Sequence, residues 1–264
     1  MTTPASPYEF DQDTAVRAVA AGVYEGTITS RWNIGPVPNG GYVLAVGMAA
    51  LRAALPCPDP LSVTAHYLRP SVPGPVRITV ETIKVGRQYS TAVARMTQAE
   101  KETARILATY GDLRRGGGPT HVAGAPPPLP PRDTLTPLRR DNVADFAGRF
   151  EMLSTNLSFV PGRAVGPAEV SGWLRFADGR RPDVHALGLI ADAFPPAAFH
   201  VLAPAWVPTL ELTVHIRAHP ASEWLRCVFR TRFIFGGLLE EDGEIWDETS
   251  TLVALSRQLA AAPR

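Results

Sequence analysis

The chain has few cysteines and no long hydrophobic run, and each shortage excludes a class of protein. Cys57 and Cys227 are the only cysteines among 264 residues and lie far apart, so neither a disulfide framework nor a CxxC metal or redox motif is expected. No apolar run approaches the roughly 20 residues needed to span a bilayer. Residues 1–13 also lack a basic segment followed by an apolar stretch. We therefore expect a cytoplasmic protein with no membrane association.

The chain also lacks an excess of charge of either sign. It has 26 basic and 25 acidic residues, a net charge of +1, and only two lysines, Lys84 and Lys101. This balance predicts no gross attraction to nucleic acid. The motifs GxSxG, GxxxxGK[ST] and GxGxxG are absent, which argues against a serine hydrolase, a nucleotide hydrolase and a dinucleotide-binding protein.

The length of the chain and one segment rich in glycine and proline predict two domains. At 264 residues the chain exceeds an average domain, and 45% of its residues are hydrophobic, enough for a substantial core. The stretch 114–137 contains GGG and then PPPLPP, a composition typical of a semi-rigid linker. We predict an N-terminal domain at 1–114, a linker at 115–145 and a C-terminal domain at 146–264.

The first half reads as one helix followed by a set of strands. After a strand-like run at 21–32, the sequence NGGY at 39–42 precedes VLAVGMAALRAAL, which is apolar on most faces and predicts a buried helix. Four runs of strand length follow, in which β-branched residues alternate with polar ones: 61–68, 76–85, 89–96 and 103–113.

The same order recurs in the second half. Strand-like runs at 150–159 and 169–176 precede a predicted helix at 184–193, and three further strands are expected at 209–216, 224–235 and 244–257.

A closer internal match supports this duplication. The segment TAHYLRP from Thr64 parallels TVHIRAHP from Thr213. Pro70 precedes Gly86 by 16 positions, and Pro220 precedes Gly236 by 16. A buried helix followed by long antiparallel strands predicts an α+β unit whose sheet curls around the helix, present twice.

These segments resemble a known family. NGGY with AHYLRPSVPGPVRITVETIKVGRQYSTAVARM, and then LGLIADAFPP, PTLELTVHIRAHP and LVALSRQLA, are similar to acyl-CoA thioesterases of the type II, double-hotdog kind. The resemblance implies two fused hotdog domains, each a long helix wrapped by an antiparallel sheet. It also implies hydrolysis of an acyl-CoA to free acid and CoA with no metal and no cofactor, since coenzyme A is part of the substrate.

The resemblance further implies a catalytic triad. Asp192 in IADAF matches the family's aspartate, Thr209 in PTLEL its threonine and Gln258 in LVALSRQ its glutamine. In the family these three side chains bind and activate the water that attacks the thioester. Because only the second half carries all three, one composite site per chain is expected. The Glu-Glu-Asp-Gly segment around Glu240 is interpreted as an insertion.

The first half is expected to supply substrate-binding groups. Asn39, Gly40, Gly41 and Tyr42 open the first helix, where backbone N–H groups can stabilise an oxyanion and glycine permits close approach of a thioester. Arg87, which follows a strand turn, is a candidate contact for the phosphates of coenzyme A.

Histidines leave other interpretations open. His66 and His215 occupy equivalent repeat positions, which duplication explains better than a metal site, because no third ligand appears at suitable spacing. His185 and His200 flank Asp192 in sequence, and a pair of Asp and His would suit an enoyl-CoA hydratase.

A non-catalytic acyl-CoA-binding or structural protein is a further alternative function. Exposed edge strands would favour pairing between copies, so a homo-oligomer is expected.

Overall fold

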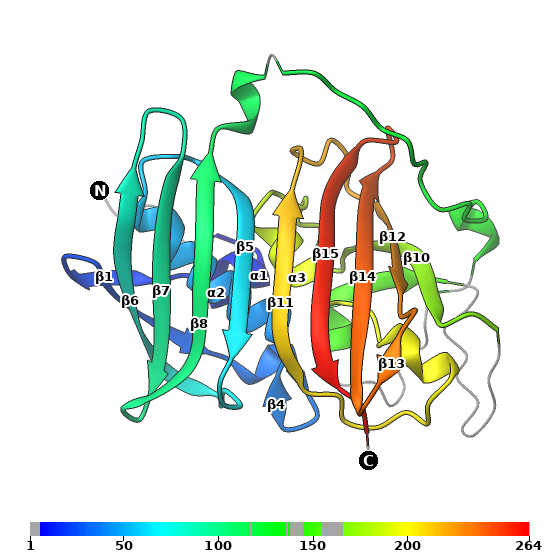
Figure 1. Cartoon of the computed structure of the whole chain (residues 1–264), viewed down its shortest axis with the longest axis horizontal. Helices are drawn as coiled ribbons and strands as arrows, with labels where there is room; N and C mark the ends of the chain where they lie inside the picture. Colours follow the sequence, from blue (N-terminus) through cyan, green and yellow to red (C-terminus); the bar gives the residue numbers. More distant parts are fainter. Residues whose placement is uncertain (1–5, 117, 136, 138–144, 155–165, 264) are drawn as a thin grey trace.

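The computed structural model describes residues 6–116, 118–135, 137, 145–154 and 166–263. Within them, 13 strands form one continuous antiparallel sheet to which both halves of the chain contribute (Figure 1). From one edge to the other the order is β1-β2-β6-β7-β8-β5-β11-β15-β14-β12-β10-β9, and β13 pairs with β14. Counted outward from the β5–β11 pair, each half begins with the strand that follows its main helix, continues with its last strand and then runs back through the earlier strands. The two halves therefore have the same strand order, as a duplicated unit requires.

The strands of the first half in the large sheet are β1 (Arg17–Ala20), β2 (Val23–Ile28), β5 (Asp59–Tyr67), β6 (Gly74–Val85), β7 (Ser90–Gln98) and β8 (Lys101–Gly111). Those of the second half are β9 (Phe150–Leu153), β10 (Glu169–Phe176), β11 (Thr209–Ile216), β12 (Leu225–Arg230), β13 (Ile234–Phe235), β14 (Leu238–Asp247) and β15 (Leu252–Ala261). A separate two-stranded ribbon consists of β3 (Asn33–Ile34) and β4 (Val37–Pro38).

The helical segments are short, with one exception. The α-helices are α1 (Glu9–Asp13), α2 (Gly40–Ala54) and α3 (Ala186–Ile190). The 3-10 helices are η1 (Ser30–Trp32), η2 (Leu113–Arg115), η3 (Arg132–Thr134), η4 (Asp145–Arg149) and η5 (Ala197–His200). None of the helices in the described part of the chain is long and apolar enough to cross a membrane.

The two halves join where β5 pairs with β11. Thr64 lies directly opposite Thr213, and their hydroxyl oxygens are 2.8 Å apart. The internal sequence match aligns these same two residues. The duplicated units therefore join edge to edge, through paired strands, at equivalent positions.

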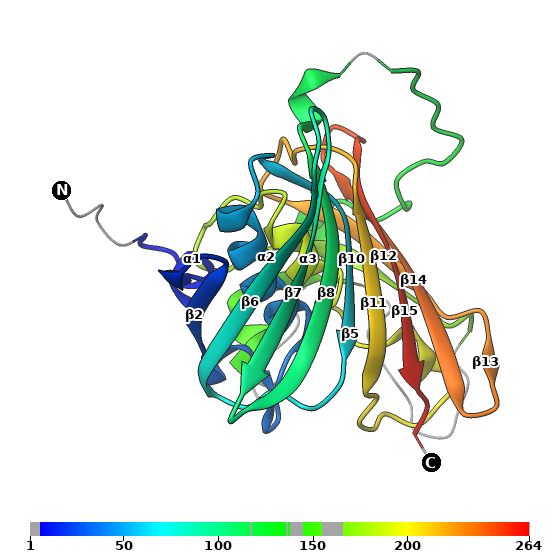
Figure 2. The same cartoon turned by 60° about the vertical axis from the view of Figure 1, so that its left-hand side comes forward.

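Helix α2 forms as the sequence predicts. Asn39 caps its first turn by accepting a hydrogen bond from the Tyr42 N–H, and the small and aliphatic residues that follow are buried on nearly every face. Gly47 lies against Ile106 of β8 and Met96 of β7, which leaves no room for a side chain there. The sheet curls around this helix, as Figure 2 shows.

The expectation of two long helices is wrong for the second half. α3 has five residues instead of the ten predicted at 184–193. Asp183 starts it by accepting hydrogen bonds from the His185 and Ala186 N–H groups. Residues 191 and 192 form a turn, and Pro195 and Pro196 then prevent the helix from resuming, because proline lacks the N–H donor.

Two other predicted strands are divided. The run 244–257 contains the end of β14 and most of β15, and a turn at 248–251 separates them, with Ser250 at a φ of 65°. The run 224–235 contains β12 and β13. β9 begins at Phe150 as predicted, whereas residues 155–159 of that expected strand lie outside the described residues.

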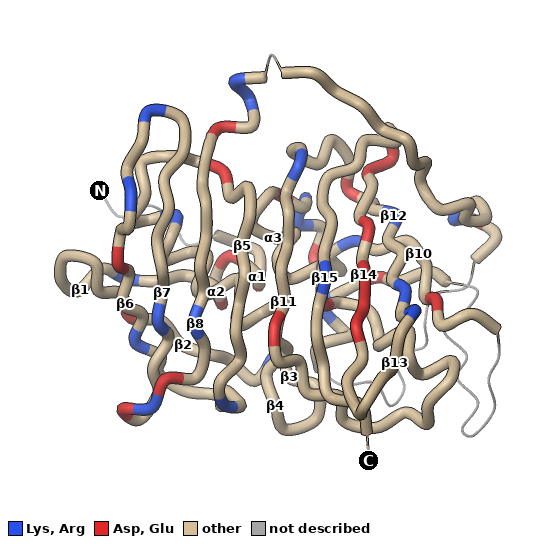
Figure 3. The backbone as a smooth tube through the Cα atoms, in the orientation of Figure 1, with Lys and Arg blue, Asp and Glu red and all other residues tan. Residues whose placement is uncertain are grey.

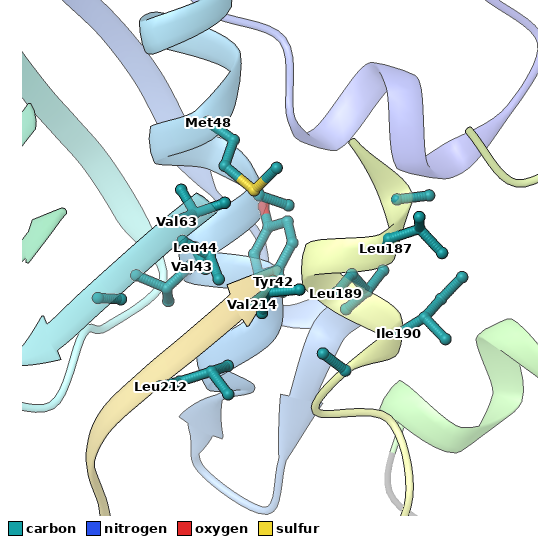
Figure 4. Close-up of a cluster of buried hydrophobic side chains, with 14 of the residues drawn as sticks. Tyr42, Val43, Leu44, Met48, Val63, Leu187, Leu189, Ile190, Leu212 and Val214 are labelled. Atoms are coloured by element: carbon teal, nitrogen blue, oxygen red, sulfur yellow. The ribbon is translucent and has the colours of Figure 1, made fainter. Parts of the chain in front are cut away.

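The core lies between the helices and the concave face of the sheet. Figure 4 shows Leu44 and Met48 of α2 beside Leu189 of α3, with Val63 of β5 and Val214 of β11 on the sheet side. All five side chains are fully buried. This packing fixes the end of α3 against the start of α2, which is where the candidate site lies.

The contact between the two helices predicts a specific sensitivity to substitution. A Cβ added at Gly41 would lie 2.8 Å from the Leu189 carbonyl oxygen and 2.9 Å from the Asp192 Cβ, so the backbones would have to separate. We expect Gly41→Ala to lower the free energy of unfolding by about 1–3 kcal/mol. Urea unfolding would measure this. Gly148→Ala is the control, since a Cβ there meets nothing within 4 Å, and equal stability of the two variants would contradict the packing argument.

Candidate active site

Asp192 joins the end of α3 to the start of α2. It follows α3 in a turn in which its own N–H donates to the Leu189 carbonyl oxygen at 3.1 Å. Its carboxylate oxygen Oδ2 accepts the Gly41 N–H at 2.8 Å and the Asn39 side-chain amide at 2.9 Å. A helix start is a favourable place for a carboxylate, because its first N–H groups have no partner within the helix.

Asn39 has two functions in this arrangement. Its Oδ1 accepts the Tyr42 N–H at 2.9 Å, and its Nδ2 donates to both the carboxylate and the backbone carbonyl of Asp192, each at 2.9 Å. The orientation of the amide is therefore determined on both sides. Tyr67 adds to the rigidity by donating from its hydroxyl to the Gly40 carbonyl oxygen at 2.8 Å.

The surroundings of Asp192 raise its pKa to about 6. Removal from water is the largest cause, and hydrogen bonds from Gly41, Asn39 and Gly40 oppose it by stabilising the ionised form. The result is a carboxylate that is mostly ionised at neutral pH yet more basic than an ordinary aspartate, which suits a general base.

A cavity of about 440 Å³ opens beside Asp192. Thr209 and Gln258 also line it, so the structure brings the three residues expected from sequence to one place. Most of the other lining residues are apolar, and they include Val43, Phe146, Phe150, Met152, Phe194, Phe199, Trp206 and Val207. Such a cavity can exclude water from an apolar group while leaving a few polar side chains to act on one bond.

The sheet positions Thr209 and Gln258. Thr209 is the first residue of β11 and pairs with Ala260 of β15. Gln258 is 6% exposed and lies on β15 between Leu212 of β11 and Glu241 of β14. The described hydrogen bonds to the Asp192 side chain come from residues 39–41 at the start of α2 and not from these two residues. Thr209 and Gln258 therefore share the cavity with Asp192 without bonding to it directly.

Of the residues predicted to bind substrate at the start of α2, some line the cavity and others have structural partners instead. Asn39 and Gly40 line the cavity. The Gly41 N–H, expected to be an oxyanion donor, is instead bonded to Asp192. Tyr42 belongs to the core, where its ring stacks on Trp32 with centroids 5.5 Å apart and its hydroxyl donates to the Asp13 carbonyl oxygen.

Arg87 is not brought to the cavity. It is exposed in the hairpin between β6 and β7. That hairpin and the end of β5, where the cavity-lining Tyr67 lies, are at opposite ends of the sheet (Figure 1). The prediction of a strand turn with an exposed arginine is confirmed. The sequence of a turn does not show, however, at which end of the sheet the turn lies.

Two further cavity-lining residues, Tyr67 and Glu241, carry groups that can form hydrogen bonds and were not among the predicted site residues. Tyr67 ends β5, and Glu241 lies on β14 with 7% exposure. The acidic segment around Glu240 is therefore part of a strand instead of an insertion, and the acidic residues stand out on β14 in Figure 3. Side chains alternate along a strand, so three successive acidic residues in one must place at least one inward.

The histidines that suggested a metal or hydratase site, His200 included, are not among the described residues that line the cavity. His66 and His215 are both exposed, and the strand register places them opposite Glu211 and Ser62. His185 precedes α3 whereas Asp192 follows it, a separation of about 10 Å along a helix. The ring of His185 lies near Tyr110, with centroids 6.3 Å apart. This placement does not support the Asp192–His185 pair of a hydratase.

Solved structures identify the fold. A protein described as a proposed thioesterase II from Thermobifida fusca superposes with a TM-score of 0.90 at 27% identity, covering 98% of this chain and 100% of that one. A protein of unknown function with a hot dog fold from Alicyclobacillus acidocaldarius gives a TM-score of 0.89 at 21% identity, covering 98% and 99%. The chain is thus a protein of the hotdog fold.

Sequence comparison then defines the family. The model of the acyl-CoA thioesterase N-terminal domain matches residues 28–111, and that of the C-terminal domain matches residues 121–262. An uncharacterized protein of Mycobacterium tuberculosis is 29% identical over 272 residues and covers 92% of each chain. The chain belongs to the acyl-CoA thioesterase family and is a thioester hydrolase.

The raised pKa of Asp192 predicts a pH-dependent cost in stability. The folded-state pKa of about 6 lies above the ordinary value of about 3.9. The contribution of this group to stability is therefore full below pH ~4 and is lost as the pH rises through ~6. We expect Asp192→Asn to gain on the order of 2–3 kcal/mol of stability relative to the wild type between pH 4 and pH 8.

Urea unfolding of both proteins at several pH values would measure this gain. Asp133→Asn, at an exposed aspartate, is the control and should track the wild type. A constant difference between Asp192→Asn and the wild type across the pH range would contradict the assignment.

Proposed function

We propose that the protein hydrolyses the thioester bond of an acyl-CoA by activating water with Asp192, while Thr209 and Gln258 hold that water. The observation that carries the proposal is the fixed carboxylate of Asp192 in an apolar cavity that Thr209 and Gln258 also line. With Oδ2 bonded to Asn39 and Gly41, Oδ1 is the oxygen left to take a proton.

The steps follow from this geometry. Asp192 accepts a proton from water while the water oxygen forms a bond to the thioester carbonyl carbon. The carbonyl oxygen then carries negative charge until the carbon–sulfur bond breaks and the electrons of that bond leave with the sulfur. The proton that Asp192 took then returns to the thiolate, which gives one carboxylic acid and one thiol. Positioning by Thr209 and Gln258 reduces the entropic cost of the attack.

The cavity supports an acyl group as the part of the substrate that is enclosed. Its aromatic and aliphatic lining favours an apolar chain or ring next to the reacting carbonyl. Arg69 is the cation that lines the cavity in the described residues, and its guanidinium donates to the Glu102 carbonyl oxygen at 2.8 Å. We therefore propose that burial of the acyl group contributes more to substrate binding at this site than contacts with charged side chains do.

A thiol-release assay tests the proposed reaction. Acyl-CoAs with short, medium, long and aromatic acyl groups should include at least one that the wild type hydrolyses. We expect Asp192→Asn to lower kcat on that substrate at least about 100-fold, the range typical of a lost general base. The variant should remain folded, because an asparagine oxygen can still accept the Gly41 N–H.

Asp133→Asn again serves as the matched control and should keep full activity. Normal turnover by Asp192→Asn would contradict the proposed base. Tight binding of acyl-CoA by the wild type without thiol release would instead indicate a binding protein.

A further inference from the structure

Glu241 is a second buried carboxyl group in the same cavity. β14 directs it inward, beside Gln258, which lies opposite it on β15. Its Oε2 accepts the N–H of Ala197, the first residue of η5, at 2.6 Å. The side chain is thus held from two elements, the strand that carries it and the segment that follows Asp192.

The charges around Glu241 disfavour its ionised form. The acidic groups near it are Asp192, across the cavity, and Glu240, the preceding residue on β14. The basic residues on this part of the sheet, Arg232 and Arg257, form ion pairs with Asp242 on the outer face. Among the described ion pairs, none involves Glu241.

This environment raises the pKa of Glu241 to about 8. Burial is the largest cause, the Ala197 N–H opposes it, and the negative charges of Asp192 and Glu240 add to it. At neutral pH Glu241 therefore carries its proton while Asp192 is mostly ionised. Because Oε2 accepts the N–H of Ala197, Oε1 is the oxygen that holds the proton.

Thioester hydrolysis needs a donor that two N–H groups at the start of α2 do not supply. Negative charge that develops on the carbonyl oxygen must meet a hydrogen-bond donor fixed in advance. The N–H of Gly41 is bonded to Asp192 and that of Tyr42 to Asn39, so the start of α2 does not supply these two groups. Arg69, Ser71 and Trp206 also line the cavity, but Glu241 is the donor that lies directly beside Gln258 on the neighbouring strand.

We propose that Glu241 is a catalytic residue that, in its protonated form, donates a hydrogen bond to the thioester carbonyl oxygen as charge develops there. The group keeps its proton throughout, so no bond to hydrogen breaks. A carboxyl held neutral by an apolar environment is suited to this task. The inference rests on the proposed hydrolysis, for which Asp192 supplies the base.

Two substitutions at this position separate donation from proton transfer. In Glu241→Gln the amide oxygen can still accept the Ala197 N–H while the amide NH₂ donates into the cavity. Glu241→Leu keeps a similar volume and removes the donor. We expect Glu241→Gln to retain kcat at pH 7 within about fivefold, and Glu241→Leu to lose 100-fold or more, the size typical of a lost oxyanion donor.

The pH profile supplies a second readout. Wild-type activity should rise as Asp192 ionises near pH 6 and fall as Glu241 loses its proton near pH 8. In Glu241→Gln the rise should remain and the fall should disappear, because an amide does not titrate. The matched control is Glu244→Gln on the outer face of β14, where Glu244 pairs with Arg230 at 3.0 Å. It should leave activity and both limbs unchanged.

Three results would overturn the inference. Inactive Glu241→Gln would mean that the carboxyl must transfer its proton. Fully active Glu241→Leu would mean that no donor is needed there, and an alkaline fall that persists in Glu241→Gln would belong to another group. Should Glu241→Leu fail to fold in a thermal unfolding assay, the Gln profile decides alone. Absence of thiol release by the wild type would overturn the hydrolysis itself, a result distinct from all three.

Discussion

The site depends on the contact between the Asp192 carboxylate and the start of α2. The first N–H groups of α2 need partners, and a carboxylate beside an apolar cavity needs donors. The contact satisfies both requirements at once, through Gly41 and the side chain of Asn39. It needs glycine at position 41, where the carbonyl oxygens of α3 leave no space for a Cβ. The sheet curls around both helices and holds them in this position.

The contact also explains why two equal halves give an unequal molecule. β5 and β11 meet through Thr64 and Thr213 as true equivalents, yet the helices differ, with α2 spanning 15 residues and α3 five. The long helix presents its start, and the short one brings Asp192 to it. Because the residues on each side of the contact differ, duplication of the fold does not imply duplication of the site.

Much of the fold could be predicted from the sequence, because strand alternation and the repeat are local patterns. β10 and β11 have the predicted bounds, and the NGGY motif precedes α2 as expected. The length of α3 was missed because residues 184–193 are nearly all apolar and buried, which suggested a helix throughout, whereas residues 184–185 and 191–192 form turns. The position of Asp192 followed from family resemblance, but its bond to Gly41 did not, since residues 151 positions apart have no local signal. Glu241 was overlooked because the strand that directs it inward was interpreted as an insertion.

The measurement that tests the central claim most directly is a titration of Asp192 itself. Carbon-13 NMR of protein labelled at the aspartate carboxyl carbons, with the signal assigned by its loss in Asp192→Asn, gives the pKa of this group without substrate. We predict a midpoint near pH 6, raised by burial and limited by the donors at the start of α2. A midpoint near the ordinary value of about 3.9 would contradict the view that the cavity makes Asp192 a base.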